Sequence, residues 1–318
     1  MDIIKAIASE LNVRNNQVEA AVKLIDEGCT IPFISRYRKE AKGALNDEQL
    51  RNLDERLKYL RNLEDKKAQV IASIAEQGLL TDELKNQIEK ADTMVAVEDL
   101  YRPYRPKRRT RATIAKEKGL EPLANVILLQ MTGEPVVKTA EEYVSEEKDV
   151  KTPEDAVAGA KDIIAESISD NADYRTRIRE LTFKEGVLTS AAKDAEAKTV
   201  YEMYYNFSEP VAKMAGHRIL AVNRGENEKI LTVKIEAPVD KILSYLEKQI
   251  IVRDNRYTTG IIKEAIEDSY ERLIAPSIER EIRNQLTETA EAGAIKVFGK
   301  NLEQLLLQPP ITGHVVLG

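Results

Sequence analysis

Residues 50–78 read LRNLDERLKYLRNLEDKKAQVIASIAEQG, and this stretch decides the fold class. Leu50, Leu53, Leu57 and Leu60 recur at spacings of three and four residues, which places them on one face of an α-helix. The same apolar face continues to Gly78 through Leu63, Val70, Ile71 and Ile74. At about 1.5 Å per residue, this helix is more than about 40 Å long. Because the heptad register lasts only two repeats, the pattern favours a bundle helix within one chain over an intermolecular coiled coil.

The composition agrees with a helical protein that has a charged surface. The chain has 318 residues, of which 42% are apolar, 32% charged and 5% aromatic, and it lacks tryptophan. This length suits about two domains, and the abundance of Ala, Leu, Ile, Glu and Lys favours helix over sheet. We therefore predict a mainly α, elongated, multi-helix scaffold with helix-turn-helix-like units and one small β-hairpin.

Charge and cysteine content limit the partners and the compartment. With a net charge of -6, binding to nucleic acid or to an anionic membrane has to come from local patches. Cys29 is the single cysteine, so no disulfide can form within the chain, as is usual in a reducing cytoplasm. No stretch has the apolar length of a signal peptide or a membrane span. We expect a cytoplasmic protein without a membrane partner.

After the long helix, the sequence outlines a helix-turn-helix. Thr81 and Thr93 are suited to cap the second and third helices of this outline. However, the second helix, DELKNQIEKA (82–91), is rich in carboxylates, whereas a helix in the major groove presents cations or amides. The pattern indicates helix-turn-helix architecture without specific DNA reading.

Later segments predict further helices and one hairpin. Thr152 should cap a helix that starts at Pro153, and Gly186 marks a turn in a second helix-turn-helix-like outline. RILAVNR (218–224), a GENE turn and KILTVKIE (229–236) suggest a β-hairpin near 217–236, opened by His217 in a structural role. Pro276 should end or kink the last long helix.

These patterns divide the chain into four segments. We expect an N-terminal helical region with the long helix (1–65), a helix-turn-helix-like unit with a basic strip (66–112), a helical central region with the hairpin (113–310), and a linker that begins another domain (311–318).

Motifs for catalysis or metal binding are lacking in the sequence. Two histidines about a hundred positions apart and one cysteine do not form a zinc site of ordinary spacing. No phosphate-binding or nucleophile motif is present, and the carboxylates lie in mixed-charge helix faces. We expect no enzymatic activity, no cofactor and no metal site.

The stretch DLYRPYRPKRRTRATIAKEK (99–118) is basic in an acidic chain. Each residue before a proline is disfavoured in the α region, so YRPYRP should be extended. Its arginines could contact phosphates, and Tyr101 and Tyr104 could stack on bases. Alternatively, the arginines pair with the chain's own glutamates, and on the residues alone the two interpretations stand equal. The candidate nucleic-acid-binding residues are Arg102, Tyr104, Arg105, Lys107, Arg108, Arg109 and Arg111, with a smaller group at Arg36, Arg38 and Lys39.

Several long stretches, in order, resemble the Tex family of bacterial transcription accessory proteins. They are IPFISRYRKEAKGAL, VEDLYRPYRPKRRTRATIAKEKGLEPLA, FKEGVLTS, HRILAVNRGE and SYERLIAPSIEREIR, and they span nearly the whole chain.

This resemblance implies a role in transcription through binding of RNA or DNA, and contact with RNA polymerase or other transcription proteins. It also implies that an RNase H-like domain, helix-hairpin-helix modules and an OB-fold RNA-binding domain follow, with GHVVLG entering the first strand of the RNase H-like domain. The chain alone should then bind nucleic acid weakly, without sequence specificity and without catalysis. The alternative is a protein-interaction scaffold whose arginines are structural.

Overall fold

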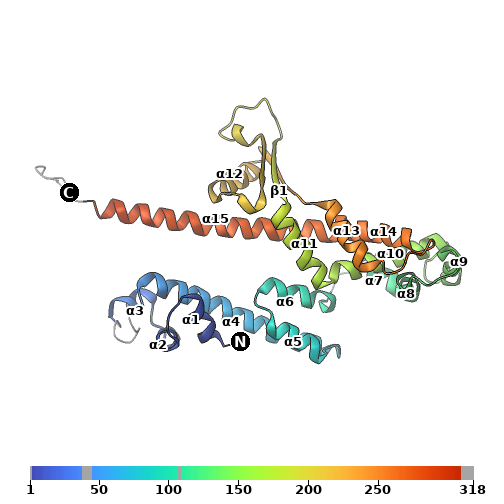
Figure 1. The fold of residues 1–318 in the computed structure, drawn as a ribbon, viewed down its shortest axis with the longest axis horizontal. Coiled ribbons are helices and arrows are strands. Elements are labelled where there is room, and N and C mark those ends of the chain that lie inside the picture. Colours follow the sequence, from blue (N-terminus) through green and yellow to red (C-terminus); the bar gives the residue numbers. More distant parts are fainter. Residues whose placement is uncertain (1, 38–44, 107–108, 309–318) are drawn as a thin grey trace, which may run out of the picture. The chain divides into compact units, whose positions relative to one another are not determined.

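The computed structural model describes residues 2–37, 45–106 and 109–308, and its chain forms two compact units (Figure 1). Unit 1 is Met1–Pro106 and unit 2 is Lys107–Gly318. Helices dominate both units, and a three-stranded antiparallel sheet lies in unit 2. The mainly α fold expected from the sequence is confirmed.

Unit 1 is built around the long helix that the leucine pattern predicts. Helix α4 (Asp47–Glu76) begins after Asn46, whose side chain accepts a hydrogen bond from the Gln49 backbone N–H at 2.7 Å. Its leucines are buried against α1, α2 and α3 of the same unit, which confirms a bundle helix within one chain. The other helices of unit 1 are α1 (Ile3–Glu10), α2 (Asn15–Asp26), α3 (Ile31–Tyr37), α5 (Asp82–Lys90) and α6 (Met94–Tyr101).

Helices α5 and α6 begin where the capping threonines predict. The hydroxyl oxygens of Thr81 and Thr93 each accept a hydrogen bond at 3.2 Å from the backbone N–H three residues later. Lys67, whose residue surface is only 3% exposed, joins α4 to the end of α5, because its ammonium donates to Glu64 and to the backbone carbonyl of Glu89. The assignment of α4, α5 and α6 to a helix-turn-helix that does not read a specific DNA sequence stays a prediction.

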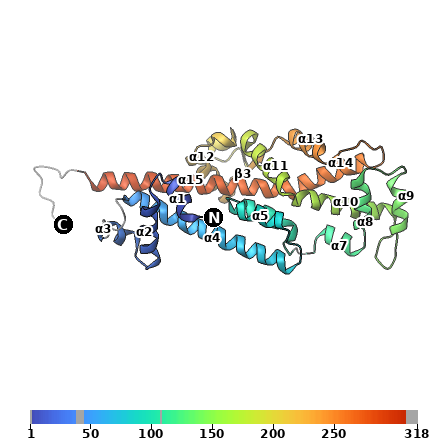
Figure 2. The same ribbon diagram turned by 60° about the horizontal axis from the view of Figure 1, so that its bottom comes forward.

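Unit 2 is organised around two long helices, α10 and α15. Helix α10 contacts α7, α8, α9 and α14, and α7 to α10 lie at the end of unit 2 that is remote from the last turns of α15 (Figure 2). The helices of unit 2 are α7 (Arg111–Glu117), α8 (Glu121–Leu129), α9 (Val136–Ala140), α10 (Pro153–Asp170), α11 (Ala172–Glu185), α12 (Gly216–Asn227), α13 (Val239–Ile250), α14 (Thr259–Asp268) and α15 (Ala275–Leu306).

The helical path continues through Pro276, where the sequence predicts an end or a kink. A π-helical turn, Ser269–Ile274, joins α14 directly to α15. Proline lacks a backbone N–H, and its ring crowds the carbonyl four residues earlier. A π-turn changes the local hydrogen-bond spacing, so it can accommodate the proline without ending the helix.

The sheet differs from the predicted hairpin. Its strands are β1 (Val187–Ala192), β2 (Asn206–Pro210) and β3 (Leu231–Glu236), in the order β2-β1-β3. The alternating burial of β3 is as predicted, but its partner is β1, with Leu188 opposite Ile235. The stretch after Gly186 is therefore a strand, so the second helix-turn-helix-like outline is wrong.

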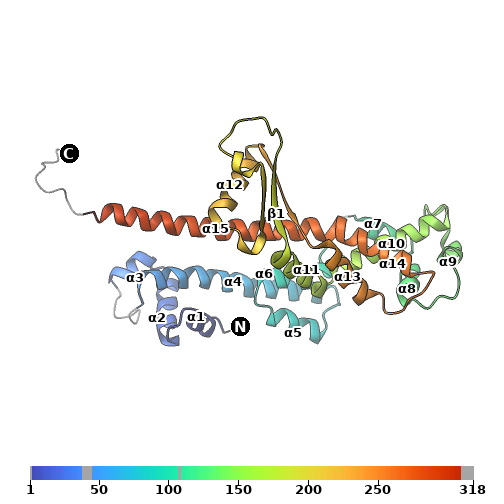
Figure 3. The ribbon, with the colours of Figure 1, turned by 45° about the horizontal axis from the view of Figure 1, so that its top comes forward.

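Residues 218–224 form part of helix α12, so the strand predicted there is wrong (Figure 3). Ile219, Val222 and Gly225 are buried at spacings of three, which puts them on one helical face. A Cβ at Gly225 would come within 2.6 Å of a Leu231 methyl carbon, so the glycine lets α12 approach β3 closely. His217, in the first turn of α12, is exposed.

Among the described residues, no helix combines the length and apolarity that a membrane span needs.

Candidate nucleic-acid interface

The basic strip, defined as residues 102–111, is divided between the two units. Arg102, Tyr104 and Arg105 belong to unit 1, whereas Arg109 and Arg111 belong to unit 2. Lys107 and Arg108 lie outside the described residues. The position of each part of the strip is therefore described only within its own unit.

In unit 1 the strip starts as a helical turn, not as the extended spine that its prolines predict. Arg102–Tyr104 form a 3-10 turn that continues α6, and Arg102 itself has α-region angles of φ -53° and ψ -43°. Pro103 can follow it because the first positions of a helical turn need no backbone N–H donor. Arg105, which precedes Pro106, is extended at φ -66° and ψ 132°, as expected.

Tyr101, just before the strip, and Tyr104, within it, both pack against the core of unit 1. The Tyr101 hydroxyl forms a 3.0 Å hydrogen bond with the Ser73 hydroxyl on α4. The Tyr104 backbone carbonyl accepts a 3.0 Å hydrogen bond from the Gln77 side chain, at the end of the same helix. These contacts hold the turn on α4.

Arg105 and Arg109, one on each side of the unit boundary in the sequence, are exposed. The Arg105 side chain is 66% exposed and lies 3.8 Å from Glu98, whose carboxylate also pairs with Lys66 at 2.6 Å. The Arg109 side chain is 72% exposed and lies 3.3 Å from Glu117. Arg102 is half-buried. Exposed ion pairs of this kind contribute about 0–1 kcal/mol, so Arg105 and Arg109 can exchange their partners for phosphate at little cost.

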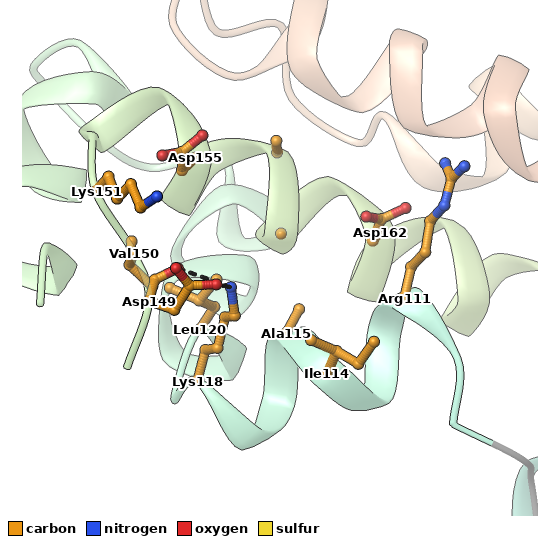
Figure 4. Close-up of a pocket in the computed structure, with 12 residues that line it drawn as sticks. Arg111, Ile114, Ala115, Lys118, Leu120, Asp149, Val150, Lys151, Asp155 and Asp162 are labelled. Carbon is orange, nitrogen blue, oxygen red and sulfur yellow. Dashed lines mark hydrogen bonds and ion pairs between the residues drawn. The ribbon is translucent and has the colours of Figure 1, made fainter. Parts of the chain in front are cut away.

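Arg111 opens α7 beside a hollow of about 430 Å³ between α7 and α10 (Figure 4). Thr110 caps α7 by accepting a 3.1 Å hydrogen bond from the Thr113 backbone N–H. Burial raises the pKa of Asp162 in this hollow, and the positive charges of Arg272 and Arg111 oppose that rise. Arg111 is exposed at the rim.

At the other end of the hollow, a lysine and an aspartate neutralise each other. Lys118 donates to the backbone carbonyl of Asp149 at 2.7 Å and to its carboxylate at 3.1 Å. The hydrogen bond from Lys118 lowers the pKa of Asp149. Because the lining contains three cations and three carboxylates, the hollow has no uniform sign of charge.

The smaller basic group does not adjoin the strip within unit 1. Arg36 is exposed on α3, and its neighbour Ser35 hydrogen-bonds to Asp47 at the first turn of α4. The turn that carries Arg102 and Arg105 is held at the opposite end of α4 (Figure 1). Along 30 helical residues the two sites are about 40 Å apart. Arg38 and Lys39 lie outside the described residues.

Unit 2 also contains arginines that are plainly structural. The Arg175 side chain is 0% exposed and contacts Glu281 at 2.7 Å, and Arg179 binds the other oxygen of the same carboxylate. Arg283 similarly pairs with Glu226 between α15 and α12. Sequence reasoning missed these buried pairs, because single charges within amphipathic helices carry no signal of their long-range partners.

The orientation of the tyrosines could have been found from spacing. Met94, Val97, Tyr101 and Tyr104 recur at intervals of three and four, the same period as the core face of α4. Val97 is fully buried and the other three are packed against the core.

These observations define a class: a helical scaffold of two units with exposed arginines at their junction in the sequence. No group of three or more metal-binding side chains occurs in the ranges the structure describes.

Comparison with known proteins gives the family. The model of the Tex-like protein N-terminal domain matches residues 1–75, and the model of the Tex central region matches residues 132–298. The chain therefore belongs to the Tex family.

Curated relatives extend over the whole chain. The Bacillus subtilis protein YdcI is 52% identical over 98% of this chain, and the transcriptional accessory protein Tex of Neisseria gonorrhoeae is 40% identical over 100%. The human S1 RNA-binding domain-containing protein 1 is 31% identical over 100% of this chain. The chain spans 44%, 42% and 33% of the lengths of these three relatives, respectively.

Proposed function

We propose that this chain binds nucleic acid through its basic strip, without sequence specificity and without catalysis, in a transcription accessory role. The observation that carries the proposal is the exposure of Arg105 and Arg109, at 66% and 72% of their side chains. The ion pairs that they form within the described residues are 3.8 and 3.3 Å long and solvent-exposed, unlike the enclosed 2.7 Å pair of Arg175. Solvent-facing guanidiniums can form two-pronged contacts with phosphate oxygens.

The names of the relatives support the same role. One relative is a transcriptional accessory protein and another is an S1 RNA-binding domain-containing protein. We therefore propose RNA or DNA as the partner of this chain, in the cytoplasm, with contact to RNA polymerase or other transcription proteins. Lys107 and Arg108 add two charges between Arg105 and Arg109 in the sequence, and we include them in the proposed surface.

Charge reversal tests the proposal. The triple variant R105E/R109E/R111E should weaken binding to a duplex and reduce the slope of log Kobs against log salt by about 2 to 3, since each lost phosphate contact removes about 0.9. The matched control is K138E/R177E/R224E, which reverses three exposed cations outside the strip that also form surface pairs.

Unchanged binding in the strip variant, or equal losses in both variants, would remove the strip from the proposal. The melting temperature is measured alongside, because a marked drop in the strip variant alone would make its arginines structural. Exposed pairs of this kind contribute about 0–1 kcal/mol, so we expect both variants to melt close to the wild type.

A separate observation favours a second candidate function, that of a protein-interaction scaffold. The last turns of α15 and the residue that follows them expose large apolar side chains, namely Ile295, Val297, Phe298, Leu302, Leu305, Leu306 and Leu307. Exposed apolar side chains that gather in one segment are typical of protein-interaction surfaces. Sedimentation velocity tests it: the chain should self-associate with rising concentration, and F298E/L305E should abolish this. The control M131E, at an equally exposed methionine, should leave the association unchanged.

A further inference from the structure

We infer that a hollow in unit 2 binds an organic cation, in which a positively charged nitrogen group is carried on a short apolar stem. An arginine side chain and an aliphatic polyamine both have this chemistry. The hollow has a volume of about 370 Å³ and lies where α11, the end of β3, the start of α13, the π-helical turn and the first turns of α15 meet. Its described lining residues all belong to unit 2 and lie outside the basic strip.

The charge of this hollow is uniformly negative. Among the described residues that line it, every charged side chain is a carboxylate, namely Glu236, Glu271 and Glu279. In the part of the chain that the structure describes, none of the three forms an ion pair. Lys241 on α13 and Arg179 on α11 pair with glutamates outside the lining. Three uncompensated carboxylates make the hollow attractive to a cation.

Two buried hydroxyl groups of the lining also lack partners. Tyr270 and Thr182 are each only 4% exposed, and both line the hollow. Within the described ranges, neither hydroxyl forms a hydrogen bond. Burial and the negative charges of Glu279 and Glu271 raise the pKa of Tyr270, so its hydroxyl stays protonated at neutral pH. Buried hydroxyls without a partner are rare in folded proteins, and a ligand with N–H donors would provide one.

The backbone holds these groups in place before any ligand arrives. Tyr270 and Glu271 belong to the π-helical turn Ser269–Ile274, and π-helical turns inside α-helices occur frequently at functional sites. The backbone N–H of Ile235 donates to one oxygen of Glu279 at 2.9 Å, which fixes this carboxylate against the end of β3. The second oxygen of Glu279 has no donor in the described part of the chain. An acceptor held in this way binds a cation without first losing its own mobility.

The form of the hollow indicates an organic cation and not a metal ion. The described residues contain no group of three or more carboxylates, histidines or cysteines that could hold a metal, so the three glutamates do not converge on one point. The rest of the wall is apolar and includes Ile178, Ile235 and Ile278. An apolar wall with a few polar groups, at this volume, is typical of small-molecule sites. The wall fits an alkyl stem, and the carboxylates fit its charged N–H donors.

Methyl NMR on the whole chain, labelled at isoleucine, tests the inference with butylguanidine as the cationic probe and 1-butanol as its neutral control. The methyl signals of Ile178, Ile235 and Ile278 should shift saturably with butylguanidine, at about millimolar affinity. The signal of Ile34, in the core of unit 1, should not move. We expect 1-butanol to bind at least about tenfold more weakly. Unmoved signals in the hollow, or equal binding of the two probes, would overturn the inference.

Three variants assign the binding to the named groups. Glu271→Gln should lower the affinity for butylguanidine by about tenfold, and Tyr270→Phe by about twofold to tenfold. The control is Glu267→Gln, which removes an exposed carboxylate of α14 outside the lining and should leave the affinity unchanged. Because the Tyr270 hydroxyl has no partner in the described residues, Tyr270→Phe should melt at or above the wild-type temperature. Equal losses of affinity in the two glutamine variants would contradict a built site.

Two further probes distinguish the sources of the cation. N-acetyl-arginine amide represents a basic side chain of a protein partner, and spermidine represents a free polyamine. Tighter binding of the arginine derivative, with the shifts in the same three isoleucines, supports a protein side chain as the ligand. Tighter binding of spermidine supports a polyamine. If neither probe shifts these signals, the inference fails.

Discussion

Replacing Glu281 with glutamine should destabilise unit 2 more than any substitution in an exposed ion pair. One oxygen of the Glu281 carboxylate accepts hydrogen bonds from Arg175 at 2.7 Å and from the Ser277 hydroxyl at 3.1 Å. The other oxygen accepts two from Arg179, at 2.9 and 2.7 Å. This carboxylate is therefore the junction between α11 and α15.

The magnitude follows from the burial of the arginines. The Arg175 side chain is 0% exposed and that of Arg179 is 19% exposed, so neither charge can be fully rehydrated after the carboxylate is lost. Removing one partner of a buried pair costs about 3–5 kcal/mol. Glutamine keeps one acceptor oxygen, so we expect a loss of about 3 kcal/mol, which corresponds to about 6–12 °C in melting temperature.

The pH dependence of stability provides an independent readout. Burial alone would raise the pKa of Glu281, but the hydrogen bond and charge of Arg179, the charge of Arg175 and the hydrogen bond from Ser277 lower it below its ordinary value of 4.5. The carboxylate thus stabilises the fold above pH 4.5, and this contribution disappears as the pH falls through the folded-state pKa. The difference between wild type and E281Q should be largest near neutral pH and should shrink in acid.

Calorimetry measures this loss, with unit 1 as an internal reference because the chain forms two units. The control is Glu180→Gln on α11, whose partner Arg177 is 52% exposed and 3.3 Å away. It should cost less than about 0.5 kcal/mol. Equal, small losses in both variants, or a difference that does not vary with pH, would refute the account of the buried cluster.

Three further substitutions, one of them a control, test the packing of unit 2. Gly225→Ala should destabilise by about 1–3 kcal/mol, because its Cβ would lie 2.6 Å from Leu231; Gly293→Ala, whose Cβ meets nothing within 4 Å, should be neutral or stabilise by up to about 1 kcal/mol in thermal melts. Gln130, which is 1% exposed, donates to the backbone carbonyl of Ile250 at the end of α13 and accepts from the backbone N–H of Arg253, in the loop between α13 and α14. Gln130→Ala should cost about 1–3 kcal/mol and raise amide hydrogen exchange in this loop, and unchanged exchange would contradict its role as a clamp.

The helices could be predicted because their signals are local. The leucine spacing of α4 and the threonine caps at Thr81, Thr93 and Thr152 depend on residues within one or two turns. Such signals combine apolar periodicity with hydrogen-bonding groups at the helix start, and both survive whatever the tertiary context.

The sheet could not be predicted to the same extent, because strand pairing is a long-range property. The partner of β3 is β1, more than 40 residues earlier, with Val187 opposite Glu236. The run ILAV in α12 has high β-propensity, yet a strand there would not place Gly225 against Leu231 as the helix does. Tertiary packing overrides propensity in such short apolar runs.

The basic strip shows how much of a binding site can be predicted from the pattern of charges in the sequence. Positive charge in sequence identifies Arg105 and Arg109, and both are exposed, but the same charge appears in Arg175, which is enclosed by its own chain. The two kinds of arginine differ in the distance and burial of their carboxylate partners, and neither is local information. The tyrosines differ in the opposite way: Tyr101 and Tyr104 lie four and seven residues after Val97, and this helical spacing already indicates the core. Helical periodicity alone therefore argues against stacking of bases on these tyrosines. It favours phosphate contacts by the arginines as the interpretation of the strip.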